Sequence, residues 1–197
     1  MFQNKHELTK DGHEKTWQSN HLGPFLLTEL LLPAVKKSSY ARIINVSSLM
    51  HTRSGKINIA TVDDKKSFGM MKSYSQSKLA NVMHARALTK ELRKDGAEHV
   101  TANSLHPGGV DTELTRNTIL ALPGIKQISA PFRWFFLKTC RDGAQTSLYV
   151  ALSKKLGGIS GKYFADCKLA KENPLALDDQ ACQDLYNYSL EVTGLAK

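Results

Sequence analysis

The sequence has little cysteine and no CxxC pair; its three cysteines are Cys140, Cys167 and Cys182. An odd number of scattered cysteines argues against a disulfide framework and against a zinc site, and it is typical of a reducing compartment. No stretch is long and uncharged enough to span a bilayer, and the first residues lack the apolar run of a signal peptide. We therefore expect a soluble, cytoplasmic chain that holds no metal.

Clusters of one charge are also missing, although the formal net charge is +9. The 27 lysines and arginines are scattered, with only short pairs such as Lys36-Lys37, and no nucleic-acid-binding motif accompanies them. We expect no nucleic-acid partner, and at most a weak attraction to acidic ligands or a membrane surface. The length of 197 residues and an apolar content of 41% suit one ordinary domain with its own core.

Helical and strand patterns alternate along the chain. We expect helices over residues 13–37, 74–93, 139–153 and 178–192, and strands over residues 41–46, 100–105 and 161–165. This order indicates a single α/β domain, built on a parallel sheet with crossover helices.

A proline interrupts the first of these helices. Pro24 cannot donate to the carbonyl four residues back, which is that of Asn20. We expect the helix to kink there and to leave the Asn20 carbonyl free to accept from water. A plain bend without functional meaning is the alternative.

A tyrosine and a lysine four residues apart, Tyr74 and Lys78, lie at the start of the second helix. Residues at this spacing share one face of a helix. A cation held close to a phenol favours the phenolate, so Lys78 would lower the pKa of Tyr74 toward the range of a proton-transfer catalyst. A solvated lysine beside a half-buried tyrosine is the alternative interpretation.

Two strands lead into segments suited to ligand binding. The strand over residues 41–46 is followed by Ser47 and Ser48, and ligands bind at the carboxyl ends of strands in open α/β sheets. The next strand ends in Pro107 and Gly108, a break that lets the backbone approach a ligand closely.

An irregular segment, residues 113–138, carries an aromatic cluster. Its members include Phe132, Trp134 and Phe135. So many aromatic residues suit either a lid over a long apolar substrate or a satellite core beneath the segment.

Four motifs, taken in this order, resemble the short-chain dehydrogenase/reductases: Asn20-His21-Leu22-Gly23, Ile44-Asn45-Val46-Ser47-Ser48, Tyr74-Ser75-Gln76-Ser77-Lys78 and His106-Pro107-Gly108. Three further stretches are similar to the retinol dehydrogenase-like branch: Ser77-Lys78-Leu79-Ala80-Asn81, Gly143-Ala144-Gln145-Thr146-Ser147 and Ser160-Gly161-Lys162-Tyr163-Phe164. The resemblance covers essentially the whole chain. It implies a Rossmann-like doubly wound parallel sheet and hydride transfer between NADP, with NAD as the alternative, and an apolar alcohol or aldehyde such as retinol or retinaldehyde.

The resemblance also implies roles for single residues. Tyr74 would exchange a proton with the substrate oxygen, Lys78 would lower the pKa of Tyr74 and hold the nicotinamide ribose, and Ser48 would hydrogen-bond the substrate oxygen. Asn20 would hold, through its main-chain carbonyl, the water of a proton relay behind Lys78. The segment against the nicotinamide would be formed by Pro107, Gly108, Val110 and Thr112. The substrate would contact Ser48, Phe132, Trp134 and Phe135.

One part of the family pattern is missing from the sequence. Family members begin with a strand and a glycine-rich turn that cradles the pyrophosphate, and no such glycine trio precedes Asn20. We therefore expect residues 1–197 to be a single incomplete Rossmann-like domain, the catalytic and substrate side of an N-terminally truncated enzyme or fragment. Such a chain would be inactive alone and would self-associate, whereas full-length relatives would be membrane-associated, at the endoplasmic reticulum or mitochondrion. The alternative is a non-catalytic binding or regulatory module.

Overall fold

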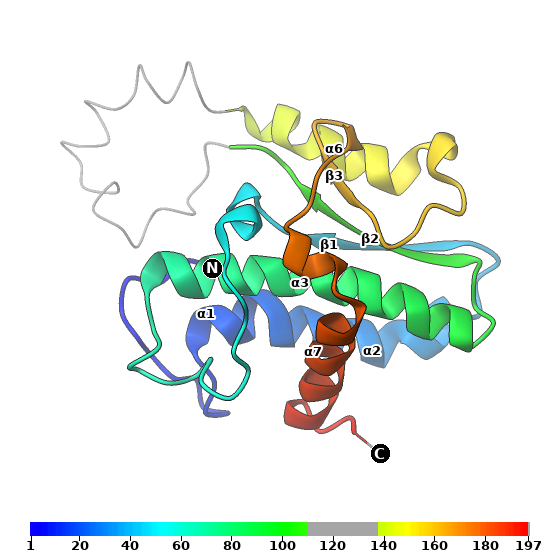
Figure 1. Cartoon of the computed structure of the whole chain (residues 1–197). Helices are drawn as coiled ribbons and strands as arrows, with labels where there is room; N and C mark the ends of the chain where they lie inside the picture. Colours follow the sequence, from blue (N-terminus) through cyan, green and yellow to red (C-terminus); the bar gives the residue numbers. More distant parts are fainter. Residues whose placement is uncertain (110–137, 197) are drawn as a thin grey trace.

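A small sheet lies between two helical layers in the computed structural model, which describes residues 1–109 and 138–196 (Figure 1). The sheet order is β1-β2-β3-β4. Its strands are β1 (Ala41–Val46), β2 (Val100–His106), β3 (Tyr163–Ala165) and β4 (Lys168–Leu169). The first three are parallel, with Asn45 opposite Ser104 and Leu105 opposite Phe164, which confirms the predicted α/β class.

The helices cover both faces of this sheet. One face carries α2 (Gly23–Val35), α3 (Met70–Lys94) and α7 (Asp179–Val192), and the other carries α6 (Cys140–Leu152) (Figure 1). Side chains alternate across the strands accordingly. On β1, Ile43 packs against the main core and Ile44 against a second cluster beneath α6. Both faces of the strand are therefore packed, but among the described residues the strand is only half-buried, and the fully buried strand that its β-branched sequence predicts is not found.

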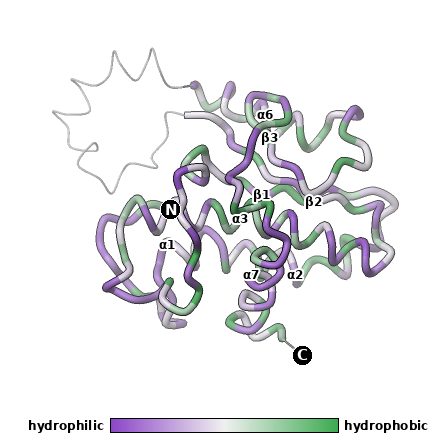
Figure 2. Tube along the Cα trace, viewed as in Figure 1, coloured by the Kyte–Doolittle hydropathy of each residue, from purple (hydrophilic) through white to green (hydrophobic). Residues whose placement is uncertain are grey.

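The main core lies between α3 and the helices around it. Leu79, Leu88 and Leu92 on α3 are fully buried, together with Trp17 and Phe25 from the N-terminal helices. The loop that leads into α3 carries many hydrophilic residues (Figure 2), while its Ile57, Ile59 and Val62 pack against the core. Hydrophobic burial of this kind contributes about 25 cal/mol per Å² of apolar surface. The core therefore fixes α3 firmly behind the sheet.

The expected kink before Pro24 takes the form of a π turn. The helical run comprises α1 (Lys15–Trp17), the π turn η1 (Gln18–Leu22) and then α2, and the N–H of Gly23 donates to the carbonyl of Gln18, five residues back. Pro24 lies in the first turn of α2, where a missing N–H costs little. Single π turns of this kind often occur at functional sites.

Two other expectations need correction. The second long helix begins at Met70, four residues before the predicted start at Tyr74. The prediction was late because the N-cap residue, Gly69, has no capping side chain that would mark the start in the sequence. The sheet is also not wholly parallel, since β3 and β4 form an antiparallel hairpin. Its two-residue loop holds Asp166 and Cys167 at positive φ, 49° and 57°. These are the conformations of a type I′ turn, which normally shows itself by glycine or asparagine.

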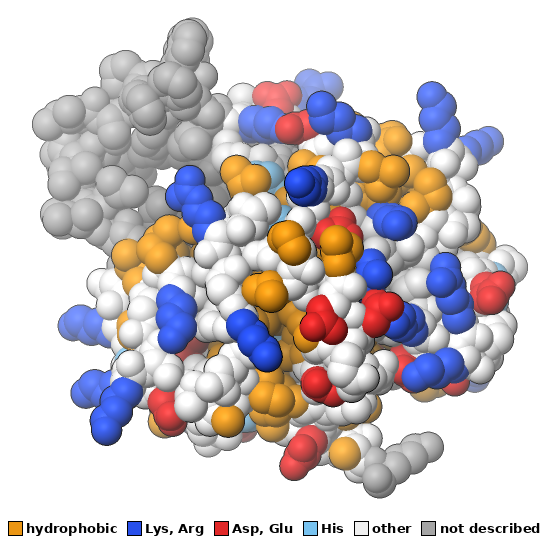
Figure 3. Space-filling model, in the orientation of Figure 1, with side chains coloured by type: hydrophobic (Ala, Val, Ile, Leu, Met, Phe, Trp, Pro, Cys, Tyr) orange, Lys and Arg blue, Asp and Glu red, His pale blue; other side chains and the backbone are white. Residues whose placement is uncertain are grey.

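Basic side chains are spread over the visible face of the molecule without a single large patch (Figure 3). Several are paired with acidic groups, such as Arg86 and Lys90, both bonded to Asp179. The surface of the described residues therefore agrees with the scattered charge of the sequence.

Candidate active site

The carboxyl end of β1 is tied to the middle of α3. The hydroxyl of Ser47 donates to the carbonyl of Lys78 at 2.7 Å. In return, Lys78 Nζ and Asn81 Nδ2 each donate to the carbonyl of Val46, both at 3.2 Å. Ser48, one residue beyond this junction, is therefore placed beside the face of α3 that carries Tyr74.

The side chains of Ser48 and Tyr74 are neighbours, close enough for the Ser48 hydroxyl to influence the titration of the phenol. Both line a cavity of about 340 Å³ that opens at the carboxyl ends of the strands. Burial raises the pKa of Tyr74 above its ordinary value, and the nearby Ser48 hydroxyl opposes that shift without cancelling it. The lowered pKa that we expected for Tyr74 is therefore not found, because burial is the dominant influence on its phenol.

Lys78 lies on the same face of α3 as Tyr74, with Nζ 5.8 Å from the centre of the tyrosine ring. Burial lowers the pKa of Lys78 to about 8, so the ammonium form still predominates at neutral pH. The structure therefore brings together the phenol, the ammonium and the serine hydroxyl.

Asn20 lies within the π turn and contacts α3 one turn from these groups. Its Nδ2 donates to Ser77 Oγ at 3.0 Å, and Ser77 Oγ donates to the carbonyl of Tyr74 at 2.8 Å. Pro24 has no N–H to offer the Asn20 carbonyl. Asn20, the fourth predicted residue, therefore lies beside the other three. Its side chain is held by hydrogen bonds, whereas its carbonyl lacks the N–H that residue 24 would donate in an ordinary helix.

The first residues of the chain cover one side of the site. The ring of Phe2 packs edge-on against Tyr74, with ring centres 5.0 Å apart. Asn20 Nδ2 also donates to the carbonyl of Met1, at 2.8 Å. Neither contact was predicted from the sequence.

Pro107 and Gly108 form another part of the cavity wall. Gly108 has φ of +102°, and a Cβ at this position would lie 2.7 Å from Cδ of Lys138. Glycine is therefore required by the backbone conformation, while the flexible Lys138 side chain adds a smaller constraint.

Helix α6 supplies cavity residues that sequence reasoning missed. They are Cys140, Gly143, Ala144 and Ser147, and His106 adds to them from the end of β2. The sequence did single out residues 143–147 as one of the family-like stretches. It gave no indication, however, that this stretch lies in the wall of the cavity. The small side chains of Gly143 and Ala144 leave the cavity open on this side.

Several predicted residues lie outside the described part of the chain. These are Val110 and Thr112 on the cofactor side, and Phe132, Trp134 and Phe135 in the expected lid over residues 113–138. Within the described ranges, no group of three or more His, Cys, Asp or Glu side chains could hold a metal ion. No helix in those same ranges is long and apolar enough to cross a membrane.

Comparison with known proteins identifies the family of the chain. The model of the family described as short chain dehydrogenase matches residues 1–121. Human retinol dehydrogenase 14 is 40% identical over 197 residues, 100% of this chain and 57% of that protein. Human retinol dehydrogenase 12 is 43% identical over 187 residues, 95% of this chain and 56% of that protein. The chloroplastic short-chain dehydrogenase TIC 32 B of Brassica napus is 37% identical over 193 residues, 94% of this chain and 59% of that protein.

Solved structures show the same fold. A crystal structure of an uncharacterised protein from Mycobacterium paratuberculosis matches with a TM-score of 0.72 at 25% identity, covering 96% of this chain and 62% of that one. The NADPH-bound carbonyl reductase from chicken fatty liver matches with a TM-score of 0.55 at 22% identity, covering 86% of this chain and 62% of that one.

The chain belongs to the short-chain dehydrogenase/reductase family. Within it, the chain is of the retinol dehydrogenase-like type. It spans somewhat more than half the length of the curated relatives, 56% to 59%.

Proposed function

We propose that this chain provides the catalytic and substrate side of an NADP-dependent oxidoreductase. The reaction is hydride transfer between the cofactor and an apolar alcohol or aldehyde such as retinol or retinaldehyde. The observation that carries the proposal is that Ser48 and Tyr74 line one cavity, with the Lys78 ammonium 5.8 Å from the Tyr74 ring on the same helix face. The family and the printed names of the relatives support it.

The three side chains have complementary tasks in this proposal. With its pKa raised by burial, Tyr74 is a neutral phenol at pH 7 and can donate a proton to a carbonyl oxygen. Ser48 hydrogen-bonds the same oxygen and orients it. The Lys78 ammonium favours the phenolate that remains after the proton has left, because an opposite charge stabilises it. The nicotinamide, when bound, supplies or takes the hydride.

The residues present fit the nicotinamide end of such a cofactor. Lys78 offers a half-buried ammonium to the ribose hydroxyls, and Gly108 lets the backbone come close to a planar ring. Pro107, Val110 and Thr112 complete the proposed wall, and Tyr74 contacts the ribose from the helix side. NADP is proposed over NAD, since the chicken carbonyl reductase is described as NADPH-bound.

The proposed substrate side combines the described cavity with aromatic residues of the lid. Ser48 is the polar contact, and Phe132, Trp134 and Phe135 would cover the apolar body of the substrate. We also propose contact with a membrane surface, because an apolar substrate dissolves in the membrane and could enter the site from there. Self-association or a homo-oligomer is proposed as well.

The experiment uses a chimera, in which the part of human retinol dehydrogenase 14 that precedes the matched region is fused to this chain. Oxidation of NADPH and of NADH with retinaldehyde is followed by absorbance. We expect NADPH-dependent turnover that falls at least about a hundredfold in Tyr74→Phe, since a positioned general acid contributes about 10²–10⁴ in rate. Turnover that survives Tyr74→Phe, or none in a folded chimera that binds NADPH, would count against the proposed function.

A further inference from the structure

A histidine with no exposed surface follows Ser48 in the same short turn. His51 Nδ1 lies 2.7 Å from the carbonyl oxygen of Ser48, and Nε2 lies 3.3 Å from the backbone nitrogen of Asn173. A peptide N–H can only donate, so Nε2 accepts and the ring proton must be on Nδ1. The neutral ring therefore donates to Ser48 and accepts from Asn173.

Asn173 fixes the same turn from the other side. Its Nδ2 donates to the carbonyls of His51 and Ser54, each at 2.9 Å, while its Oδ1 accepts from the N–H of Leu175 at 3.0 Å. The 3₁₀ turn η2 (Leu49–Arg53) is thereby attached to a segment about 120 residues later in the chain. Such buried and fully used polar groups specify one arrangement of the backbone.

The histidine ring is also wedged against the sheet. It packs on the ring of Tyr163 on β3, with centres 4.5 Å apart. Burial lowers the pKa of His51, which keeps the ring neutral as its two hydrogen bonds require. The ring thus cannot rotate without losing either a hydrogen bond or its packing.

Ser48 depends on this arrangement because it lies beyond the last residue of β1. Its Oγ accepts from the N–H of Met50 at 3.2 Å and lines the same cavity as Tyr74. Its carbonyl accepts from His51 twice, from the backbone N–H at 3.1 Å and from Nδ1 at 2.7 Å. Fixing the carbonyl fixes the backbone of Ser48, and with it the direction of its hydroxyl.

We propose that His51, held by Asn173, is a positioning residue that aims the hydroxyl of Ser48 at Tyr74. This inference rests on the proposed function for the catalytic meaning of that contact, but the positioning itself can be measured without turnover. No contact of His51 with substrate or cofactor is implied.

The first test is made on the unaltered chain. Nitrogen NMR of ¹⁵N-histidine-labelled protein should show a protonated Nδ1 and an unprotonated Nε2 for His51 at pH 7, the signal being assigned by its loss in His51→Gln. The opposite tautomer, or a charged ring, would overturn the proposal because Nε2 could no longer accept from Asn173.

The second test measures the phenol of Tyr74. The chain is labelled with 3-fluorotyrosine, which titrates at lower pH than tyrosine, and the Tyr74 signal is assigned with Tyr74→Phe by fluorine NMR. His51→Phe keeps the packing on Tyr163 but cannot donate, so Ser48 should lose its aim and the pKa of Tyr74 should rise. His51→Asn retains a donor near the position of Nδ1 and should bring that pKa back toward the parent value.

A control separates positioning from loss of stability. Leu92→Ala removes a fully buried side chain at the far end of α3 and should destabilise the chain without moving the Tyr74 titration. An unchanged Tyr74 titration in folded His51→Phe would overturn the proposal, as would an equal shift in Leu92→Ala. If His51→Phe does not fold, the tautomer and the His51→Asn titration decide.

Kinetics of the chimera then connect the two proposals. His51→Phe should lower kcat about tenfold or more with little change in KM, because a misplaced catalytic group affects the transition state more than substrate binding. A rise in KM alone would argue against positioning. Absence of turnover in the parent chimera would count against the proposed function only, since the NMR results still decide the role of His51.

Discussion

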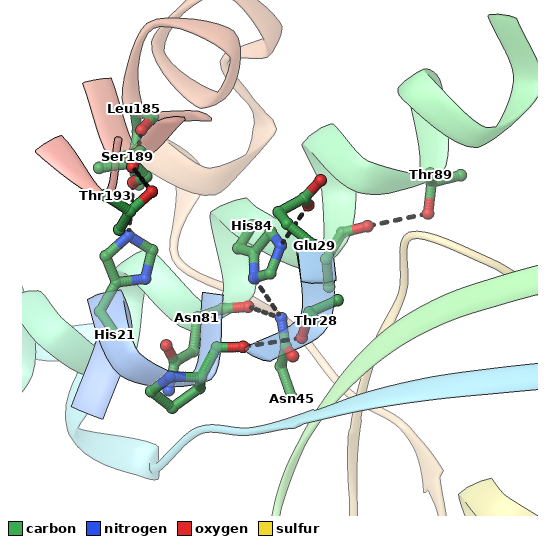
Figure 4. Close-up of polar contacts among 12 residues, drawn as sticks. His21, Thr28, Glu29, Asn45, Asn81, His84, Thr89, Leu185, Ser189 and Thr193 are labelled. Atoms are coloured by element: carbon green, nitrogen blue, oxygen red, sulfur yellow. Dashed lines mark hydrogen bonds and ion pairs between the residues drawn. The ribbon is translucent and has the colours of Figure 1, made fainter. Parts of the chain in front are cut away.

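The side-chain amide of Asn45 lies 3.1 Å from Nδ1 of His84, and this contact joins β1 to the middle of α3 (Figure 4). An amide nitrogen can only donate, so Nδ1 accepts and the ring proton is on Nε2, which faces Glu29 on α2 at 3.8 Å. The same amide donates to the carbonyl of Asn81 at 3.1 Å. A polar network thus links β1, α3 and α2, and one of its members, Asn81, donates to the same Val46 carbonyl as Lys78.

This network makes a first prediction about stability. Asn45→Leu leaves a buried carbonyl and a buried ring nitrogen without their donor, which should lower the free energy of unfolding by about 2–4 kcal/mol. Urea unfolding measures the loss. The matched control is Asn187→Leu on the exposed face of α7, where Asn187 bonds only to Gln183 and a change within about 0.5 kcal/mol is expected. Equal losses in both variants would contradict the importance of the buried network.

Lys78 makes a second prediction, about pH. Its pKa in the folded chain is about 8, below the ordinary value of 10.5. Between these values the unfolded chain binds more protons than the folded one, so this group makes the free energy of unfolding rise with pH. Lys78→Met removes the buried charge and should be more stable than the parent at pH 6, with an advantage that shrinks from pH 8 to pH 10.5.

Urea unfolding of parent and Lys78→Met at matched pH gives this difference. The comparison is needed because the pKa of Tyr74, which burial raises, acts in the opposite direction at higher pH. Lys36→Met serves as the control, since the Lys36 ammonium lies near the surface in an ion pair with Asp95 and its removal relieves no buried charge. If the difference in the free energy of unfolding between parent and Lys78→Met stayed constant from pH 6 to pH 10.5, burial would not be lowering the pKa of Lys78.

Gly108 makes a third prediction, about the cavity wall. Gly108→Ala should destabilise the chain by about 1–3 kcal/mol, because φ of +102° is strained for any residue with a Cβ. The close contact with Lys138 adds less, as that side chain can move aside. Gly55→Ala is the control, since a Cβ there meets nothing within 4 Å. Thermal unfolding of the two variants should therefore differ clearly, and similar melting temperatures would contradict the strain argument.

The sequence predicted the parts of the site that depend on local periodicity. The spacing of Tyr74 and Lys78 places both on one helix face. The β-branched run of β1 ends at Val46, two residues before Ser48. Local pattern could not show that His51 meets Asn173, because the two are 122 residues apart. It also could not predict the net pKa of Tyr74, which depends on tertiary burial more than on its helical neighbour.

The turn between β3 and β4 was missed for a different reason. Asp166 and Cys167 adopt positive φ without the glycine that usually marks such a turn. The turn can be recognised only from the antiparallel pairing of β3 with β4 in the structure. The start of α3 was placed too late because Gly69 gives no capping signal.

The aromatic residues of the proposed lid make a fourth prediction. In the chimera, Trp134→Ala should raise KM for long-chain aldehydes more than for short ones, because only a long apolar substrate would reach an aromatic cover. Steady-state kinetics over a series of aldehyde lengths provides the measurement. Equal effects on long and short substrates would favour a satellite core over a lid.

The outer edge of β1 makes the last prediction, which concerns association of the chain. β1 pairs only with β2 among the described residues, and Val46 at its end is 48% exposed. An unpaired edge with an apolar side chain is a template for pairing with another strand. On α2, Leu27, Leu30 and Leu31 are also exposed at helical spacing. We expect the chain expressed alone to self-associate, with the β1 edge as the principal contact.

Sedimentation velocity over a range of concentrations tests this expectation. Val46→Lys places a charge on the edge, as natural edge strands often do, and should shift the chain toward monomer. Leu177→Lys is the matched control, because Leu177 is 51% exposed in the turn Pro174–Leu177, which packs on α3 and α7. If Leu30→Glu dissociates the chain and Val46→Lys does not, α2 rather than the strand is the contact. A parent chain that remains monomeric at every concentration would contradict the prediction, because neither the edge of β1 nor the exposed leucines of α2 would then drive association.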